Sequence, residues 1–431
     1  MNTARIDDSP RALVRLSWPI FIELLLQLLV GNMDQVQLSH FNGTAVAAVG
    51  NANTIITVVL LTFNVISLAA TILVSQYRGA GDLHSTNQIY TLSLVVNGLV
   101  ALALAGALVL GAPGLLGLMQ VPAELLAEAR SYLVITAAAL PFQALMLTFS
   151  AFLRAGAQMK IIMFITGAVN LCNIAGNAVF INGLGPLPRM GAAGAALSSS
   201  LFRAAGAALM AWAFFRSVPE AKIGPGQLRP FPRPLLRRLM AIGLPAGGEG
   251  LSYNLSQASC LVLVNLMGTY VVTTRMYAVM FANCIYMLIQ AVSQAGQIVI
   301  GYQVGARDLD GADRCCRRML KIFCPVTVGL AALLWLFARP LYGLFSADAR
   351  VIALGAQVML VEVVLEVGRA FNIVLVRALQ AVGVGLGYVL GVVLGWGLVG
   401  LWTAFACDEC LRGILFVARW KSGKWRRMKT I

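Results

Sequence analysis

The sequence predicts an all-α polytopic membrane protein with twelve transmembrane helices in two six-helix lobes. Of its 431 residues, 59% are hydrophobic and 11% are charged, whereas a soluble domain carries about 25% charged residues. A spanning helix needs roughly 20 mainly apolar residues, and eleven or twelve runs of this kind follow one another along the chain. These runs do not alternate between apolar and polar residues as barrel strands do, so we expect helices throughout.

The positions of the basic residues predict how the chain is oriented. The net charge is +15. Most Arg and Lys residues fall in every second connection between spans; Arg78, Arg154 and the basic residues of the tail "RWKSGKWRRMK" are examples. The intervening turns hold only Arg189, Arg339 and Arg350. This positive-inside bias predicts both termini in the cytoplasm. We therefore expect a multi-pass protein of the inner or plasma membrane, without a cleaved signal and without a nucleic-acid partner.

The residues that enzymes and cofactor sites need are sparse. Eight cysteines are scattered without a disulfide or zinc pattern, and the chain has two histidines and neither a DDxxD nor an HExxH motif. We therefore expect no enzymatic activity and no cofactor.

An internal repeat runs through the chain at an offset of 226 residues. Pro19 and Glu23 match Pro245 and Glu249, and "QYRGAGDL" (76–83) matches "YQVGARDL" (302–309). Six spans per half return the chain to its starting side, so the halves are predicted to be parallel repeats. Repeats of this kind are typical of transporters, whose sites lie near the bilayer midplane.

The repeat predicts the domain limits. The first lobe covers 1–218, a Pro-, Gly- and Arg-rich cytoplasmic linker covers 219–234, and the second lobe covers 235–431. The region before the last span is too short for two ordinary spans. We expect either a shortened, distorted eleventh helix near 383–397 or about 20 residues absent from the sequence near 383–390.

Polar residues within the first helix form a stripe. Glu23, Gln27 and Asp34 lie within about 40° of one another at 100° per residue. An ionisable side chain at the bilayer centre costs about 2.5 to 3.5 kcal/mol, so each is a functional candidate. Asp34 has no cation three or four residues away, and Asn173 and Asn177 share one face of the fifth helix as candidate partners.

The second half has its own polar candidates. Glu249 and Tyr253 are one turn apart in the seventh helix, and the tenth carries Glu362, Glu366, Arg369 and Asn372. The acids and Arg369 share one face, so a structural ion pair is the alternative to a substrate site.

Several stretches of the sequence resemble a known family. "WPIFIELLLQLLVGNMDQVQLSHFNGTAVAAVG" is similar to the first helix and turn of the multidrug and toxic compound extrusion (MATE) transporters of the MOP flippase superfamily. "VSQYRGAGD", "IGYQVGARD" and "NIAGNAVFINGLG" resemble further parts of that family. The resemblance implies a V-shaped, alternating-access antiporter that exports organic cations, amphipathic drugs or toxic metabolites in exchange for H⁺ or Na⁺, and we expect a monomer.

The resemblance also assigns residues. The family's cation-coupling aspartate falls on Asp34, with Na⁺ as one candidate ion there, and its partners fall on Asn173 and Asn177. One branch has an acid where this chain has Tyr253, and Glu249 is the nearest substitute. Arg369 lies close to that branch's tenth-helix aspartate, which places coupling in the first lobe. The rival function is a lipid or lipid-linked oligosaccharide flippase of the same superfamily, which would need a strongly cationic cavity.

Overall fold

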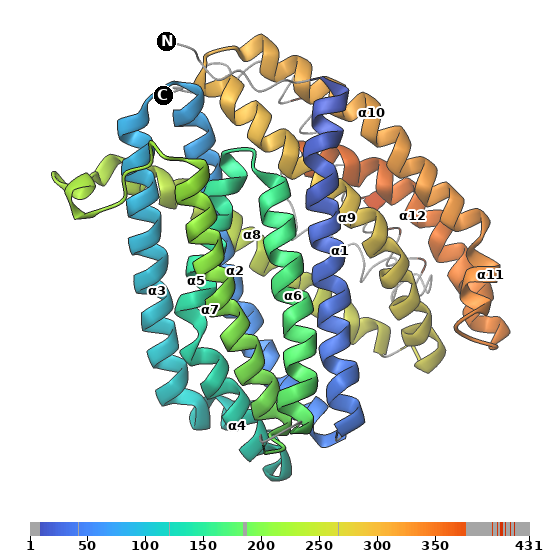
Figure 1. Cartoon of the computed structure of the whole chain (residues 1–431). Helices are drawn as coiled ribbons and strands as arrows, with labels where there is room; N and C mark the ends of the chain where they lie inside the picture. Colours follow the sequence, from blue (N-terminus) through green and yellow to red (C-terminus); the bar gives the residue numbers. More distant parts are fainter. Residues whose placement is uncertain are drawn as a thin grey trace. The chain divides into compact units, whose positions relative to one another are not determined.

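A computed structural model describes most of the chain as helix (Figure 1). It covers residues 9–375 except 42, 120, 184–187 and 266, together with positions 399, 403, 406, 407, 410, 414 and 418. No strand occurs among these residues, and the all-α fold class is confirmed. The predicted short helix near 383–397 and most of the twelfth span lie outside the described residues.

The helices of the first half follow the predicted spans in order. They are α1 (Pro10–Phe41), α2 (Gly43–Gly79), α3 (Leu83–Leu118), α4 (Ala123–Ala138), α5 (Leu140–Ala155), α6 (Met159–Asn182) and α7 (Gly191–Ser217). The fourth span consists of α4 and α5, which meet at a 47° bend. The bend lies at Ala139, two residues before Pro141, because proline cannot donate the hydrogen bond that would continue the helix.

The second half begins with a short 3-10 helix and continues with α-helices, all of them long except the six-residue α11. These are η1 (Pro225–Leu228), α8 (Arg233–Asn265), α9 (Thr269–Gly305), α10 (Leu309–Leu336), α11 (Ala338–Gly343) and α12 (Ala349–Leu375). Within the described residues, six helices are long and apolar enough to cross a membrane, or seven if the bent pair is counted as one span.

The internal repeat is visible in the backbone. Gly81 and Arg307, which are equivalent at the offset of 226, both have a left-handed backbone, with φ of 74° and 60°. Each is followed by an aspartate that caps the next helix. Asp82 Oδ1 accepts a hydrogen bond from the Ser85 N–H at 3.0 Å, and Asp308 Oδ1 accepts one from the Gly311 N–H at 2.8 Å. The turn from α2 to α3 therefore recurs from α9 to α10.

The chain divides into two compact units. One comprises Ile22–Gly247, and the other comprises the residues from Gly248 onward together with α1 up to Phe21. The two division points, after Phe21 and after Gly247, are themselves 226 residues apart. Each unit therefore contains the start of the other repeat's first helix. The lobe limits at 219 and 235 stay predictions.

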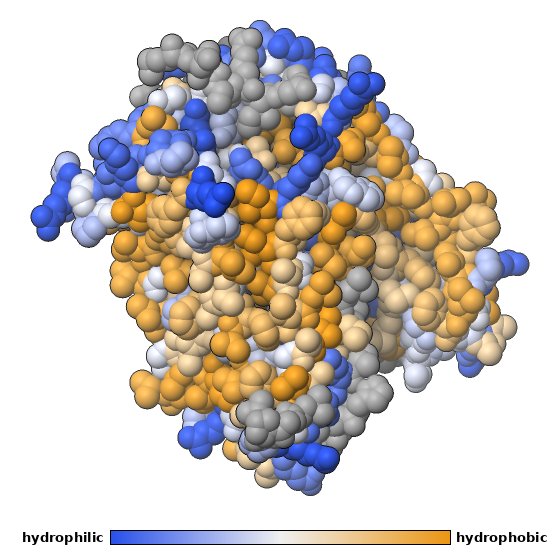
Figure 2. Space-filling view, in the orientation of Figure 1, coloured by the Kyte–Doolittle hydropathy of each residue, from blue (hydrophilic) through white to orange (hydrophobic). Residues whose placement is uncertain are grey.

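The first unit has a continuous apolar core and an apolar outer surface. Its core joins α2, α3, α4 and α7 around buried residues such as Phe63, Leu116 and Leu133. Figure 2 shows hydrophobic side chains over the middle of the visible face of α3, α5 and α7, with hydrophilic ones at both ends. Such a band is the surface that a bilayer requires.

The predicted linker is attached to α3. Asn87 is buried, and its Oδ1 accepts a hydrogen bond from the Lys222 N–H at 3.0 Å. The Thr91 hydroxyl accepts a second one from the Gly224 N–H at 3.3 Å. The segment before η1 is therefore bound to the first unit by backbone hydrogen bonds.

Candidate functional site

The register between α1 and α6 positions the first-half candidates. Gln37 Nε2 donates a hydrogen bond to the Ile174 carbonyl at 3.0 Å. Nearer the start of both helices, a Cβ on Gly167 of α6 would lie 3.4 Å from Leu26 Cδ1 of α1. The two helices thus run side by side in the same direction. Asp34, one turn before Gln37, is level with the stretch of α6 that begins at Asn170; its side chain lies outside the described set.

Asn173 and Asn177 occupy the buried interior beside α7. Asn173 is 7% exposed and Asn177 is fully buried. Asn173 Nδ2 donates to the hydroxyls of Ser198 and Ser199, at 3.3 Å each. Because both hydrogen bonds use the side-chain nitrogen, the side-chain oxygen Oδ1 of Asn173 is the atom suited to a cation.

Glycine makes the close approach of α6 and α7 feasible. A Cβ on Gly176 would lie 2.4 Å from Phe202 Cε2 and 2.7 Å from Ser198 Oγ. A larger residue there would push α7 away from Asn173, so Gly176 supports the geometry of the site.

Glu23 has a cationic partner that the sequence did not indicate. It is 6% exposed, and Arg154 Nη2 of α5 lies 3.1 Å from its Oε1 and 3.3 Å from its Oε2. Gln27 Nε2 also donates to Glu23 Oε1 at 3.4 Å, as expected for a shared helix stripe. The sequence grouped Arg154 only with the basic loops. Glu23 is neutralised in this state, and its role in coupling stays a prediction.

The second half contains the ion pair predicted in α12. Arg369 Nη1 lies 3.0 Å from Glu362 Oε1 and also contacts Glu366 Oε1. Both acids are buried, and the Arg369 guanidinium lies 5.9 Å from the ring centre of Tyr286. These contacts confirm the shared face. Whether the cluster also binds substrate stays a prediction.

For the remaining candidates of the second half, the structure shows only the helix on which each residue lies. Glu249 and Tyr253 belong to α8 and Asn372 to α12, and their side chains lie outside the described set. Sequence reasoning missed Arg275 of α9, whose Nη2 donates to Gln257 Oε1 of α8 at 3.1 Å. An arginine six residues into an apolar span was the available signal.

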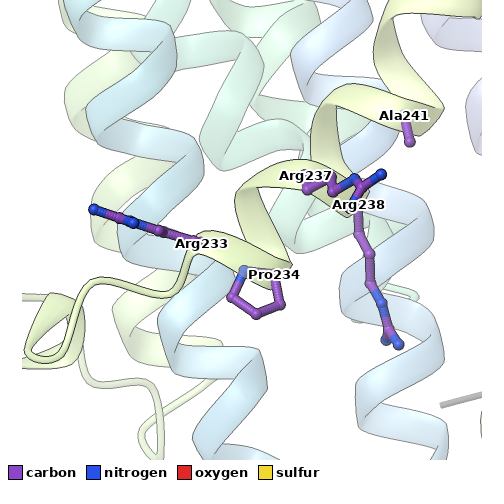
Figure 3. A pocket seen from close by; sticks show the side chains of 5 residues that line it. All are labelled: Arg233, Pro234, Arg237, Arg238 and Ala241. Atoms are coloured by element: carbon purple, nitrogen blue, oxygen red, sulfur yellow. The ribbon is translucent and has the colours of Figure 1, made fainter.

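A basic pocket of about 490 Å³ lies at the start of α8 (Figure 3). It is lined by Arg233, Pro234, Arg237, Arg238 and Ala241. Figure 3 shows Arg233 and Arg238 pointing to different sides of the helix. Arg238 Nη1 donates to the Tyr77 hydroxyl at 2.7 Å, so this arginine secures α8 to α2. The side chains do not converge on a common point.

Metal-binding clusters are not found in the part of the chain that the structure describes. No group of three or more His, Cys, Asp or Glu side chains there has the arrangement to hold a metal ion.

Comparison with known proteins decides the family. The MatE family model matches the chain twice, over residues 19–179 and 245–405. The chain belongs to the MatE family. The two matches start 226 residues apart, which is the offset of the internal repeat. Because members of the MatE family are transporters, this MatE protein is a transporter and not an enzyme.

Individual relatives agree with this assignment. The chain is 33% identical to the "Uncharacterized transporter YisQ" of Bacillus subtilis, over 97% of this chain and 95% of the relative. It is 24% identical to the "Probable multidrug resistance protein NorM" of Thermotoga maritima, over 98% and 94% of the two chains. A crystal structure of MATE in the bent conformation matches with a TM-score of 0.87 and 19% identity, over 97% and 95%. The MatE protein thus shares the two-lobe, twelve-helix fold of the solved transporters.

Proposed function

We propose that this MatE protein is a secondary active antiporter that exports organic cations or other amphipathic compounds in exchange for H⁺ or Na⁺. The relationship to NorM multidrug resistance proteins supports the substrate class. We further propose that it works as a monomer in the inner or plasma membrane with both termini in the cytoplasm, as the basic loops indicate.

The observation that carries the proposal is the register of α1 on α6. The hydrogen bond from Gln37 to the Ile174 carbonyl sets Asp34 level with the stretch of α6 from Asn170 to Asn173. A carboxylate and amide oxygens at one depth are hard ligands that suit Na⁺, and a buried carboxylate is also a proton acceptor. Asp34 is therefore the ion switch of the proposed mechanism.

The exchange follows from competition for this buried charge. An empty, ionised Asp34 is costly in a low-dielectric interior, and a proton or Na⁺ removes that cost. Ion occupancy therefore favours one conformation, and the ion gradient shifts the populations of the inward-open and outward-open states. A cationic substrate leaves when the neutralised site no longer attracts it.

Dye efflux from proteoliposomes tests the proposal. The wild type is expected to export ethidium when either a pH gradient or a Na⁺ gradient is imposed, and Asp34→Asn is expected to lose this dependence. Asp348→Asn is the matched control, because Asp348 lies just before α12 and pairs with the exposed Arg350 at 2.9 Å. Gradient-driven efflux that is normal in Asp34→Asn would refute the assignment of Asp34. Movement of a labelled lipid without dye efflux would favour the flippase instead.

A further inference from the structure

The exposed face of α8 changes from basic to apolar within its first turns. Arg233, Arg237 and Arg238 are exposed, and Ala241 and Leu244 follow them on the same face, with Leu244 63% exposed. The arginines extend over about 8 Å of the helix axis, at about 1.5 Å per residue, which matches a lipid headgroup layer of about 5 to 8 Å. Leu244 lies about 9 Å further along the axis, at the depth of the acyl chains.

The opposite face of α8 packs against α2 of the same compact unit. Leu239 is buried, and a Cβ on Gly243 would lie 3.2 Å from Val65 Cγ1 of α2. Arg238 Nη1 donates to the Tyr77 hydroxyl of α2 at 2.7 Å. These contacts fix the rotation of α8 about its axis. The face that carries the arginines therefore points away from the core of the first unit.

The pocket of about 490 Å³ opens on this arginine face (Figure 3). Its lining includes Ala241 as well as the three arginines, so the cavity joins charged groups to the apolar part of the face. A compact inorganic anion is held by donors that converge on it, but Arg233 and Arg238 point to different sides of the helix. The pocket is therefore suited to an extended, amphiphilic anion.

The positive charge around the pocket is not compensated by nearby acids. Residues 221–248 contain Lys222 and four arginines but no Asp or Glu. Within the described part of the chain, none of the ion pairs includes Arg233, Arg237 or Arg238. Basic pockets between helices at a membrane surface attract the headgroups of anionic lipids.

The internal repeat shows that this charge pattern is not required of every first helix. At the offset of 226, Arg237 corresponds to Arg11, but Arg233 corresponds to Asp7 and Pro234 to Asp8. The positive-inside rule accounts for basic residues near both helix starts. It does not account for the absence of acids at the start of α8 alone.

We propose that the pocket at the start of α8 binds an anionic phospholipid. Arg233, Arg237 and the remaining donors of Arg238 contact the phosphate, and one acyl chain lies along Ala241 and Leu244. A free phosphate would use the arginines but not the apolar surface beyond them. This inference goes beyond the proposed transport function, because the lipid is neither exported nor exchanged for an ion.

Native mass spectrometry of the purified full chain tests the lipid site. Binding of the first lipid is titrated with dioleoyl phosphatidylglycerol and with dioleoyl phosphatidylcholine, which has the same acyl chains but no net charge. The wild type is expected to bind the anionic lipid about tenfold or more tightly. Arg233→Gln combined with Arg237→Gln should weaken its binding about thirtyfold, at about fivefold per charge, and leave phosphatidylcholine unchanged. Arg238 is retained because it secures α8 to α2.

Two controls separate a lipid site from general surface charge and from a site for small anions. Arg11→Gln combined with Arg15→Gln removes the same charge from two exposed arginines at the start of α1, and it should bind phosphatidylglycerol as the wild type does. Glycerophosphoglycerol, the headgroup without acyl chains, should not compete with the lipid. Elution profile and melting temperature report the folded state of each variant.

Three results would each overturn the proposal: equal affinity of the wild type for the two lipids, equal losses in the two double variants, or competition by glycerophosphoglycerol as strong as that by the lipid. Binding is measured without an ion gradient, so the result does not depend on whether the protein is an antiporter.

Discussion

Arg154 of α5 forms a buried ion pair with Glu23 of α1, with Nη2 3.1 Å from Oε1. The Glu23 side chain is 8% exposed and that of Arg154 is 20% exposed. Glu23 lies just after the point where α1 passes from the second compact unit to the first. The pair therefore fixes the start of this part of α1 to the bundle that carries Asn173.

Breaking this pair is expected to destabilise the protein. Glu23→Gln leaves Arg154 largely buried without its carboxylate, and we expect a loss of about 2 to 3 kcal/mol, below the value for a fully buried pair because Arg154 is partly exposed. Thermal unfolding in detergent measures the change. Glu23→Gln combined with Arg154→Gln should recover part of the loss. A melting temperature of Glu23→Gln equal to that of Asp348→Asn would show that the pair contributes little.

The close contact of α6 and α7 makes a second prediction. Gly176→Ala places a Cβ 2.4 Å from Phe202 Cε2, and this overpacking should cost about 1 to 3 kcal/mol. Gly106→Ala in α3 is the matched control, since no atom outside the adjacent backbone of its own helix lies within 4 Å of its new Cβ. Melting temperature and dye efflux are compared for both. If Gly176→Ala is as stable and active as Gly106→Ala, the helices are less tightly packed than the structure indicates.

The acidic cluster of α12 depends on its arginine. Arg369→Gln removes the guanidinium from Glu362 and Glu366, which are 1% and 0% exposed. Buried carboxylates that lose a cationic partner cost about 3 to 5 kcal/mol. The melting temperature should fall accordingly, whereas Arg350→Gln, at a side chain that is 72% exposed, should change it little. An unchanged melting temperature in Arg369→Gln would contradict a stabilising role.

Limited proteolysis tests whether the linker is attached to α3. Asn87→Ala removes the acceptor of the Lys222 N–H, so the segment should open more often. Trypsin is then expected to cleave after Lys222 several times faster than in the wild type. Asn182→Ala is the control, because that amide bonds only within its own helix, at 3.1 Å. Equal cleavage rates would indicate that this hydrogen bond does not secure the linker.

Much of the fold could be predicted from the sequence because its signals are local or periodic. Apolar runs predicted the helices, and the offset that matched Pro19 to Pro245 also relates the left-handed residues Gly81 and Arg307. The shared face of Glu362 and Arg369 followed from helical spacing alone. The candidate site was predicted less well. The described helices place Asp34 level with α6, but its own contacts stay a prediction.

The sequence by itself determined the membrane class, the duplication and the family, since these depend on composition and on order along the chain. Only the tertiary structure decided which polar residues meet. Glu23 pairs with Arg154, which is 131 positions away. Helical periodicity states which residues share a face, but the neighbour that a face meets is set by packing between distant segments. For this reason the charge on α1 was visible in the sequence, and its partner was not.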